Sequence, residues 1–308
     1  MARTRGMIAA AGTLALAALA LTACSSGNPL ATGGSTSGAK APAGSITVGS
    51  AAFPESEILA YIYADALTDA GVKATVKPNI GQRDVYIAAL KDGSIDLVPE
   101  YTGNLLQYFD QSQNPQGADA VYAALQKATP AGFEVLDQAP GSDADSYNVT
   151  KKFSEDNHIT SLSDLAGYKG SLKVGANSEF GTRPYGIPGL KSDYGVTATL
   201  VAIADSGGPN TQKALQDGTV QLADIYSTDP SIKADGFVTL SDPKNMILAQ
   251  NVVPLINSSK ASAKVKDTLN KVSTKITTDA LIDINTKSAV DKESADAIAS
   301  AWVKANGF

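Results

Sequence analysis

A short stretch of this sequence occurs twice, at residues 89–101 and again at residues 214–226. Each copy has an Ala-Leu pair, then Asp-Gly, then two apolar positions, and ends on a tyrosine twelve positions after the alanine. This order predicts a helix end, a turn and a strand. Tyr101 and Tyr226 then lie where a strand ends, which in open α/β sheets is the edge that binds ligands. The repeat predicts two similar α/β units that share a ligand site, although helix, turn and strand also follow one another in any α/β protein.

The first 23 residues are typical of a secretory signal peptide. Arg3 and Arg5 precede an apolar stretch over residues 7–21, which is shorter than the about 20 apolar residues of a membrane span. The small residues directly before Cys24 resemble the lipobox of bacterial lipoproteins, in which the cysteine is diacylated and becomes the first mature residue. Cys24 is the only cysteine of the chain, so it predicts a lipid attachment point and no internal disulfide. Ordinary signal-peptide cleavage nearby is the alternative.

Residues 24–44 are rich in Ser, Gly, Ala, Thr and Pro and have no apolar periodicity, which predicts a flexible tether after the cysteine. Removal of residues 1–23 leaves 23 basic and 31 acidic residues, a net charge of −8. Because phosphate contacts require clustered Lys and Arg, this charge argues against nucleic-acid binding. We expect a folded domain held by lipid at the extracytoplasmic face of the cell membrane.

Strand and helix patterns alternate along most of the remaining chain, which predicts an α/β fold. Strand patterns cover residues 46–50, 74–76, 95–98, 133–136, 172–174, 199–203, 237–240 and 252–256. Helix patterns begin at Pro54 and cover residues 83–91, 118–129, 161–165 and most of 260–305.

The last 50 or so residues contain helix patterns only, and such tails usually dock onto an existing lobe rather than form a sheet of their own. We therefore assign residues 45–146 and 252–308 to one lobe and residues 147–251 to a second lobe. The chain would cross between the lobes near Tyr147 and near Asn251, and these crossings are expected to act as hinges.

Five motifs in a fixed order, at residues 49–56, 96–103, 179–183, 188–190 and 226–229, resemble a known family. They are similar to the substrate-binding proteins of osmoprotectant ABC importers, which bind glycine betaine, choline or carnitine, and with the lipobox to actinobacterial ProX-type lipoproteins. The resemblance implies a two-lobed periplasmic-binding-protein-like fold of type II with two crossings. It also implies a small-molecule ligand, delivery to an ABC permease in the membrane, and no cofactor. We expect a monomer.

In this family four tyrosines surround the trimethylammonium group of the ligand. By motif position, the resemblance places these four at Phe53, Tyr101, Tyr226 and Gln250, and the arginine that holds a ligand carboxylate at Arg183. Three positions are still aromatic, and each ring facing a cation contributes about 0.5–2 kcal/mol. The amide of Gln250 adds a donor and an acceptor, so a polyol, an amino acid or a plant-derived polar solute is the alternative ligand.

Two threonines follow the repeated tyrosines, and each is expected either to cap the next helix or to donate to the ligand: Thr102 and Thr228. Phe53 fits a plain core position equally well, and Arg183 fits an ion pair. Four further tyrosines lie within reach of the predicted cleft, namely Tyr86, Tyr147, Tyr185 and Tyr194.

An enzyme and a metal-binding protein are the alternatives from other classes. His158 is the only histidine and lies in no recognisable nucleophile context, and the glycines at residues 206–209 lack the context of a phosphate loop. One His and one Cys are too few for a transition-metal site. Asp143 and Asp145 lack the spacing of a calcium loop. The sequence therefore favours a binding protein without catalytic activity.

Overall fold

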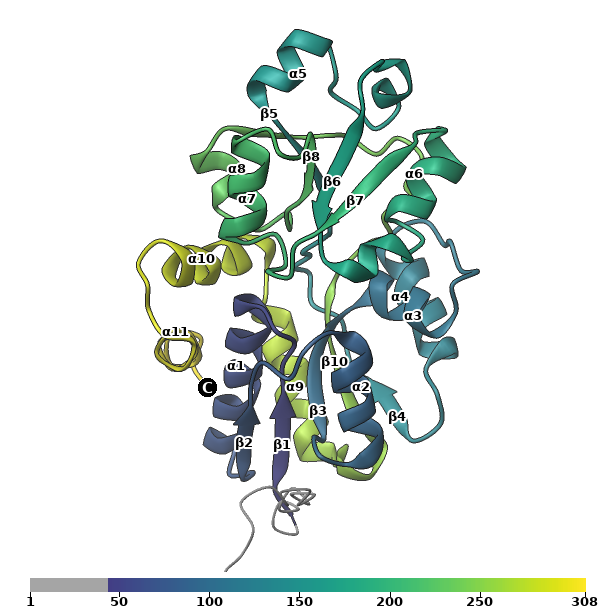
Figure 1. The fold of residues 1–308 in the computed structure, drawn as a ribbon. Helices are drawn as coiled ribbons and strands as arrows, with labels where there is room; N and C mark the ends of the chain where they lie inside the picture. Colours follow the sequence, from purple (N-terminus) through teal and green to yellow (C-terminus); the bar gives the residue numbers. More distant parts are fainter. Residues whose placement is uncertain (1–43) are drawn as a thin grey trace, which may run out of the picture. The chain divides into compact units, whose positions relative to one another are not determined.

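The computed structural model describes residues 44–308; the predicted signal peptide, Cys24 and the tether up to residue 43 lie outside the described residues. The fold is α/β and has two five-stranded sheets with helices packed against them (Figure 1). In this part of the chain, no helix is both long and apolar enough to cross a membrane.

Across the first sheet the strands follow in the order β2 (Ala74–Lys77), β1 (Ile46–Gly49), β3 (Leu97–Tyr101), β10 (Val252–Asn257) and β4 (Phe133–Val135). β1 pairs in parallel with β2 and β3, whereas β10 is antiparallel to β3 and β4. In the sequence β10 follows every strand of the second sheet. The chain therefore leaves the first sheet once and returns to it once.

Across the second sheet the order is β7 (Ala198–Ala202), β6 (Leu172–Ala176), β8 (Leu222–Asp224), β5 (Tyr147–Thr150) and β9 (Phe237–Thr239). β6 pairs in parallel with β7 and β8, and β5 is antiparallel to β8 and β9. The two sheets share one feature. In each, the strand of the repeated stretch, β3 or β8, pairs antiparallel with the first strand after a crossing, β10 or β5.

The helices divide into three groups. Four helices lie, in sequence order, between β1 and β4 of the first sheet: α1 (Pro54–Asp69), α2 (Arg83–Asp92), α3 (Thr102–Phe109) and α4 (Ala118–Ala128). Between the strands of the second sheet lie α5 (Lys151–Asn157), α6 (Ile187–Tyr194), α7 (Pro209–Gln216), α8 (Ser231–Ala234) and the 3-10 helices at Asp164–Gly167 and Ser178–Gly181. After β10 come a 3-10 turn at Ser258–Lys260 and then α9 (Ala263–Lys275), α10 (Thr278–Ala289) and α11 (Ala295–Ala305).

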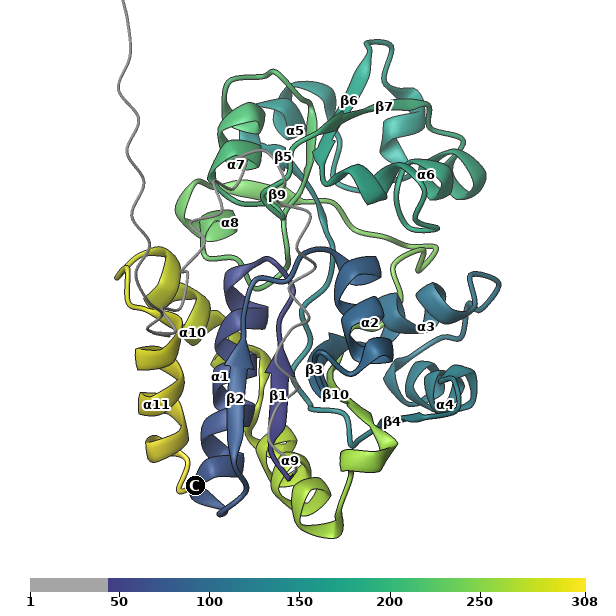
Figure 2. The ribbon, with the colours of Figure 1, turned by 60° about the horizontal axis from the view of Figure 1, so that its bottom comes forward.

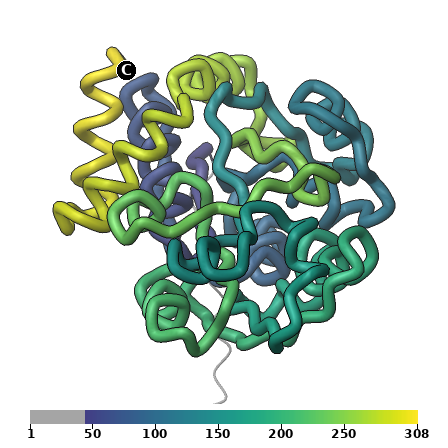
Figure 3. Tube along the Cα trace, turned by 90° about the horizontal axis from the view of Figure 1, so that it is seen from above, coloured from purple at the N-terminus to yellow at the C-terminus, as the bar shows by residue number. Residues whose placement is uncertain are grey.

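Helix α1 organises the core around the first sheet. Pro54 at its first position and Glu55 and Glu57 in its first turn suit the start of a helix, where backbone N–H groups are unpaired and the dipole is positive. The helix contacts α9, α10 and α11, and its Tyr63 and Leu67 are fully buried. Figure 2 shows α11 alongside α1, and Figure 3 shows the same neighbours from above. The helical tail thus docks on the first helix of the fold.

Most predicted elements are present, and the prediction of an all-helical tail is confirmed by α9, α10 and α11. The two copies of the repeat end differently. Tyr101 is the last residue of β3, because Val252 of β10 pairs with it, whereas β8 ends at Asp224, where its pairing with Tyr147 of β5 ends. A helix begins directly after Tyr101 but only at Ser231 in the second copy.

Candidate functional site

A cavity of about 70 Å³ is lined by residues from both sheets, from the helices beside them and from the first crossing. On the same scale one water molecule needs about 10–15 Å³, so the cavity takes roughly five to seven water-sized groups. Four of the predicted site residues line it, namely Phe53, Tyr101, Arg183 and Tyr226. Its polar lining includes Arg83, Asn104, Asp143, Asp145, Asn177, Glu179 and Asp224.

Three aromatic rings from strand ends meet at this cavity. Phe53 directly precedes α1, Tyr101 ends β3, and Tyr226 follows β8 by two residues. The ring centroid of Phe53 lies 6.2 Å from that of Tyr101 and 5.3 Å from that of Tyr226, which it meets edge to face at 70°. Phe53 is therefore not simply a core residue, because its ring joins the two tyrosines of the repeated stretch.

A second aromatic group comes from the second sheet and its helices. Phe180 and Tyr185 line the cavity, and their ring centroids lie 6.0 Å apart. Tyr147 packs behind them, with its hydroxyl donating to the Tyr185 carbonyl at 2.9 Å. Among the tyrosines that the sequence placed near the cleft, Tyr86 and Tyr185 line the cavity, whereas Tyr147 does not.

Three buried carboxyl groups line the cavity: Asp143, Asp145 and Asp224 are 6%, 8% and 3% exposed. Burial raises the pKa of Asp145. Burial together with the neighbouring charge of Asp145 raises the pKa of Asp224 well above its usual range. Burial and the charge of Glu55 do the same to the pKa of Asp143. A cation placed here would relieve this repulsion.

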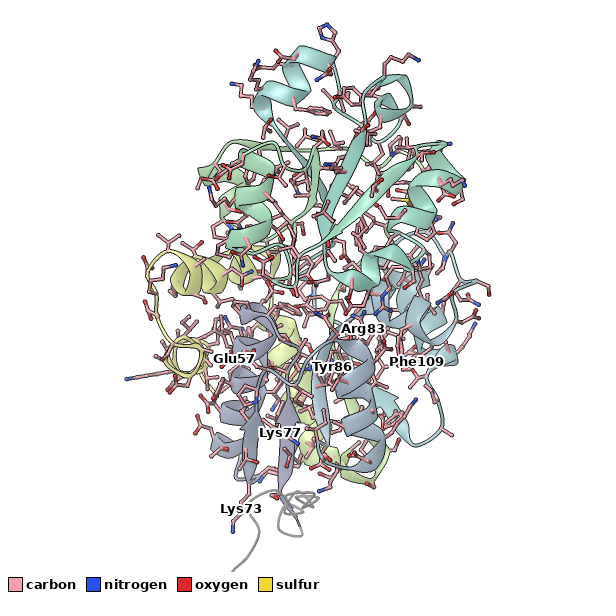
Figure 4. All side chains as sticks on the ribbon, in the orientation of Figure 1. Glu57, Lys73, Lys77, Arg83, Tyr86 and Phe109 are labelled. Carbon is pink, nitrogen blue, oxygen red and sulfur yellow. The ribbon has the colours of Figure 1, made fainter. Side chains whose placement is uncertain are left out.

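Two arginines also line the cavity, and they differ in what they bind. Arg83 at the start of α2 makes a two-pronged ion pair with buried Glu100, with Nε–Oε1 at 2.9 Å and Nη2–Oε2 at 3.0 Å. Tyr86, one turn further along the helix from Arg83 (Figure 4), donates to the same carboxylate at 2.8 Å. Arg183 lies over the ring of Tyr108, with its Cζ 5.8 Å from the ring centroid. Within residues 44–308 no ion pair involves Arg183.

Gln250 lies behind the cavity wall. It is fully buried, its Oε1 accepts from the Asn104 backbone N–H at 3.0 Å, and its Nε2 donates to Asn104 Oδ1 at 2.7 Å. Asn104, which does line the cavity, donates in turn to Asp145 at 2.6 Å. Gly103 permits this approach, because a Cβ there would lie 2.7 Å from the Ala249 carbonyl oxygen. Gln250 thus orients Asn104 and through it Asp145.

The two threonines do not cap helices, so the capping alternative is wrong. Thr102 is itself the first residue of α3, and its hydroxyl donates to the Ala249 carbonyl at 2.9 Å and accepts from the Asn251 N–H at 3.1 Å. Thr228 precedes α8 by three residues and donates to Glu55 at 2.9 Å. Both side chains instead join segments that are far apart in the sequence.

Sequence reasoning missed the carboxyl groups as part of the site. One signal was available, because Asp224 precedes Tyr226 by two positions and side chains two apart on an extended chain point to the same side. Asp143 and Asp145 lie in a stretch without regular structure, where no such rule applies. Within the described residues no cluster of three or more His, Cys, Asp or Glu has the geometry to hold a metal ion.

The sequence profile of the OpuAC family, described as the substrate binding domain of the ABC-type glycine betaine transport system, matches residues 44–305. The chain belongs to this family. The OpuAC-family chain is therefore a transport substrate-binding protein and not an enzyme. Substrate-binding domains of ABC importers bind small solutes on the extracytoplasmic side and interact with a permease.

Individual relatives of the OpuAC-family chain agree with this assignment. It is 28% identical over 277 residues to the glycine betaine-binding protein YehZ of Escherichia coli, covering 85% of this chain and 91% of that protein. It is 23% identical to the carnitine transport binding protein OpuCC of Listeria monocytogenes, covering 85% and 87%.

Solved structures confirm the fold as a type II periplasmic-binding-protein fold. A crystal structure of a glycine betaine/carnitine/choline ABC transporter protein aligns with a TM-score of 0.66 at 22% identity, over 84% of this chain and 98% of that one. Apo YehZ aligns with a TM-score of 0.60 at 28% identity, over 86% and 99%.

Proposed function

We propose that this chain is the solute-binding lipoprotein of an ABC importer, and that the cavity between its sheets takes a quaternary-ammonium compatible solute. Glycine betaine, choline and carnitine are the candidates, and the bound solute is delivered to a membrane permease. The observation that carries the proposal is the convergence of Phe53, Tyr101 and Tyr226 on a cavity that also contains buried carboxyl groups.

The rings and carboxyl groups suit a cation that cannot donate hydrogen bonds. A trimethylammonium group is attracted by the faces of aromatic rings, at about 0.5–2 kcal/mol for each. A cation in the same cavity would lower the raised pKa values of Asp143, Asp145 and Asp224 and so favour their negatively charged form. Three rings give about 1.5–6 kcal/mol and micromolar binding needs about 8 kcal/mol, so further contacts such as the carboxyl groups and Arg183 have to supply the rest.

The end of the solute that is opposite the trimethylammonium group would face Arg183. A guanidinium forms two parallel hydrogen bonds with a carboxylate, which glycine betaine and carnitine carry and choline lacks. Since Arg183 has no ion-pair partner among residues 44–308 and lines the cavity, it is available for that contact. Gln250, Thr102 and Thr228 act one layer behind, by holding the residues and segments that form the wall.

The sheet membership of the strands supports a lobe of residues 45–146 and 252–308 and a lobe of residues 147–251. The two chain crossings then act as hinges, and a solute that touches both lobes favours their closed arrangement. At the N-terminus, the family match begins at residue 44, where the predicted tether ends. We also propose that residues 1–23 are a signal peptide, that Cys24 is lipidated, and that the protein is a monomer of the actinobacterial ProX type.

One observation favours a different polar solute on the same scaffold. Asn104, Asp145 and Asp224 present amide and carboxyl groups to the cavity, and an uncharged polyol or an amino acid would use them as hydrogen-bond partners.

Calorimetric titration separates the two ligand classes. The protein would be titrated with glycine betaine, choline, carnitine, proline betaine and two uncharged polyols. Tighter binding of at least one quaternary-ammonium compound supports the proposal. Equal or tighter binding of a polyol contradicts it and favours the alternative.

A further inference from the structure

Glu55 is a buried carboxylate that no cation neutralises. It lies in the first turn of α1, is 3% exposed, and enters no ion pair within residues 44–308. Its Oε1 accepts from the Tyr101 hydroxyl at 2.6 Å, and its Oε2 accepts from Thr228 Oγ1 at 2.9 Å and from Asn285 Nδ2 at 2.5 Å. Hydrogen bonds to an ionised group are roughly twice as strong as those between neutral groups.

The three donors come from three separate parts of the fold. Tyr101 ends β3 of the first sheet, Asn285 belongs to α10 in the tail, and Thr228 follows β8 of the second sheet. Asn285 also donates to Thr228 Oγ1 at 2.9 Å, so that the threonine hydroxyl is fixed from two sides. The bond from Thr228 to Glu55 therefore joins the segments of the two predicted lobes.

The three rings of Phe53, Tyr101 and Tyr226 each belong to a residue or a segment that contains or contacts the Glu55 carboxylate. Phe53 precedes Glu55 by two residues, Tyr101 donates to it, and Tyr226 precedes Thr228 by two residues. Glu55 and Thr228 do not line the 70 Å³ cavity. They line a second cavity of about 460 Å³, which shares Phe53, Asp143 and Tyr226 with the first. A solute held between the rings thus has no contact with the Glu55 carboxylate.

Asp143 is the other charged group in this cluster. It accepts from the Thr228 N–H at 2.9 Å and from Ser227 Oγ at 3.1 Å. Burial raises the pKa of Glu55, and burial together with the charge of Glu55 raises the pKa of Asp143 well above its usual range. Of the two, Glu55 has the larger set of donors and is therefore the better place for the negative charge.

We infer that Glu55 is a positioning residue that latches the two lobes together and sets the spacing of the three rings, without touching the solute. The inference rests on the proposed function, since it assigns Glu55 to the closed, solute-bound arrangement. Loss of the latch lets the lobes separate more often. It should therefore speed solute release and leave association almost unchanged.

Thr228 offers the sharpest test, because its hydroxyl makes the hydrogen bond that joins the Glu55 carboxylate to the second lobe. Thr228→Val keeps the shape and the backbone bond to Asp143 but removes the donor, whereas Thr228→Ser keeps the donor. For a hydrogen bond to a charged group we expect Thr228→Val to weaken choline and glycine betaine binding about 10- to 100-fold. Thr228→Ser should stay within about threefold of wild type.

Thr268→Val is the matched control, because the buried Thr268 hydroxyl donates only within its own helix, to the Lys264 carbonyl at 2.9 Å. It should bind as wild type. Glu55→Gln is a second variant that keeps the shape and removes the charge, and it should also release solute faster. Thermal melting of every variant checks that the fold is kept.

Stopped-flow dissociation and calorimetric titration provide the readout. A faster dissociation rate in Thr228→Val and Glu55→Gln, with rescue in Thr228→Ser, supports the latch. If wild type binds a quaternary-ammonium solute and Thr228→Val and Glu55→Gln release it at the wild-type rate, the latch is wrong and the proposed function stands. If wild type binds none of these solutes, the proposed function fails and the latch fails with it.

Discussion

Tyr226 provides the cleanest perturbation of the proposed cation site. Its ring lines the cavity and meets Phe53 edge to face at 5.3 Å. Burial raises the pKa of Tyr226 well above its usual range, and the residue as a whole is half-buried. Tyr101 is less suitable, because its hydroxyl is bonded to Glu55 and its removal would also disturb the proposed latch.

Tyr226→Leu keeps an apolar side chain and removes the π-electron face. The lost cation–π contact should cost about 0.5–2 kcal/mol, which raises the Kd for choline roughly 2- to 30-fold. Tyr226→Phe keeps the ring and should stay within about threefold of wild type. Tyr226→Ala loses packing as well, so we expect about 1–3 kcal/mol.

Calorimetric titration with two ligands separates charge from shape. Choline carries a trimethylammonium group, and 3,3-dimethylbutanol has the same shape with a neutral carbon in place of the nitrogen. Tyr226→Leu should discriminate less between the two than wild type does. Tyr168→Leu is the matched control, because the Tyr168 ring also packs edge to face on a phenylalanine, Phe153, at 5.1 Å, away from the cavity. Wild-type choline affinity in Tyr226→Leu would refute the cation–π reasoning.

Three further outcomes follow from the same cavity. Arg183→Gln should weaken glycine betaine about tenfold or more and leave choline nearly unchanged, because only the former has a carboxylate for the guanidinium; equal losses in titration would contradict this. Gln250→Ala should weaken every solute by releasing Asn104, and a bound-state structure in which Asn104 keeps its wild-type position would argue against that role. The raised pKa values of Asp143, Asp145 and Asp224 mean that the folded chain holds protons more tightly than the unfolded chain. The bound protons therefore stabilise the folded state at low pH, and this contribution to the free energy of unfolding is lost as the pH rises through the raised pKa values. The melting temperature should increase when the pH is lowered from about 8 to about 5, and Asp224→Asn should show a smaller slope. A melting temperature that falls over that range, or an unchanged slope in the variant, would count against this reasoning.

The sequence predicted the aromatic part of the site because that part depends on local rules. The repeated stretch placed Tyr101 and Tyr226 at strand ends, and the structure brings both to one cavity with Phe53 and Arg183. Each tyrosine lies at a strand end of its own sheet, and strand ends form the edge of an α/β sheet that binds ligands. The helical tail was predictable for a similar reason, because its apolar spacing is a local pattern.

The polar part was not predictable, because it depends on long-range packing. Gln250 occupies the position of the fourth ring in the resemblance, yet it lies behind Asn104 because Gly103 lets α3 approach the second crossing closely. From the sequence, Glu55 is an acidic residue in the first turn of a helix, where acidic residues are favourable. No local sequence pattern indicates that it contacts Thr228 and Asn285, which are 173 and 230 positions away.

A crystal structure of the chain with bound choline or glycine betaine tests the central claim most directly. The account predicts the trimethylammonium nitrogen within about 6 Å of the ring centroids of Phe53, Tyr101 and Tyr226. A solute seated in the second cavity, or held in the first without contact to rings from both lobes, would contradict it.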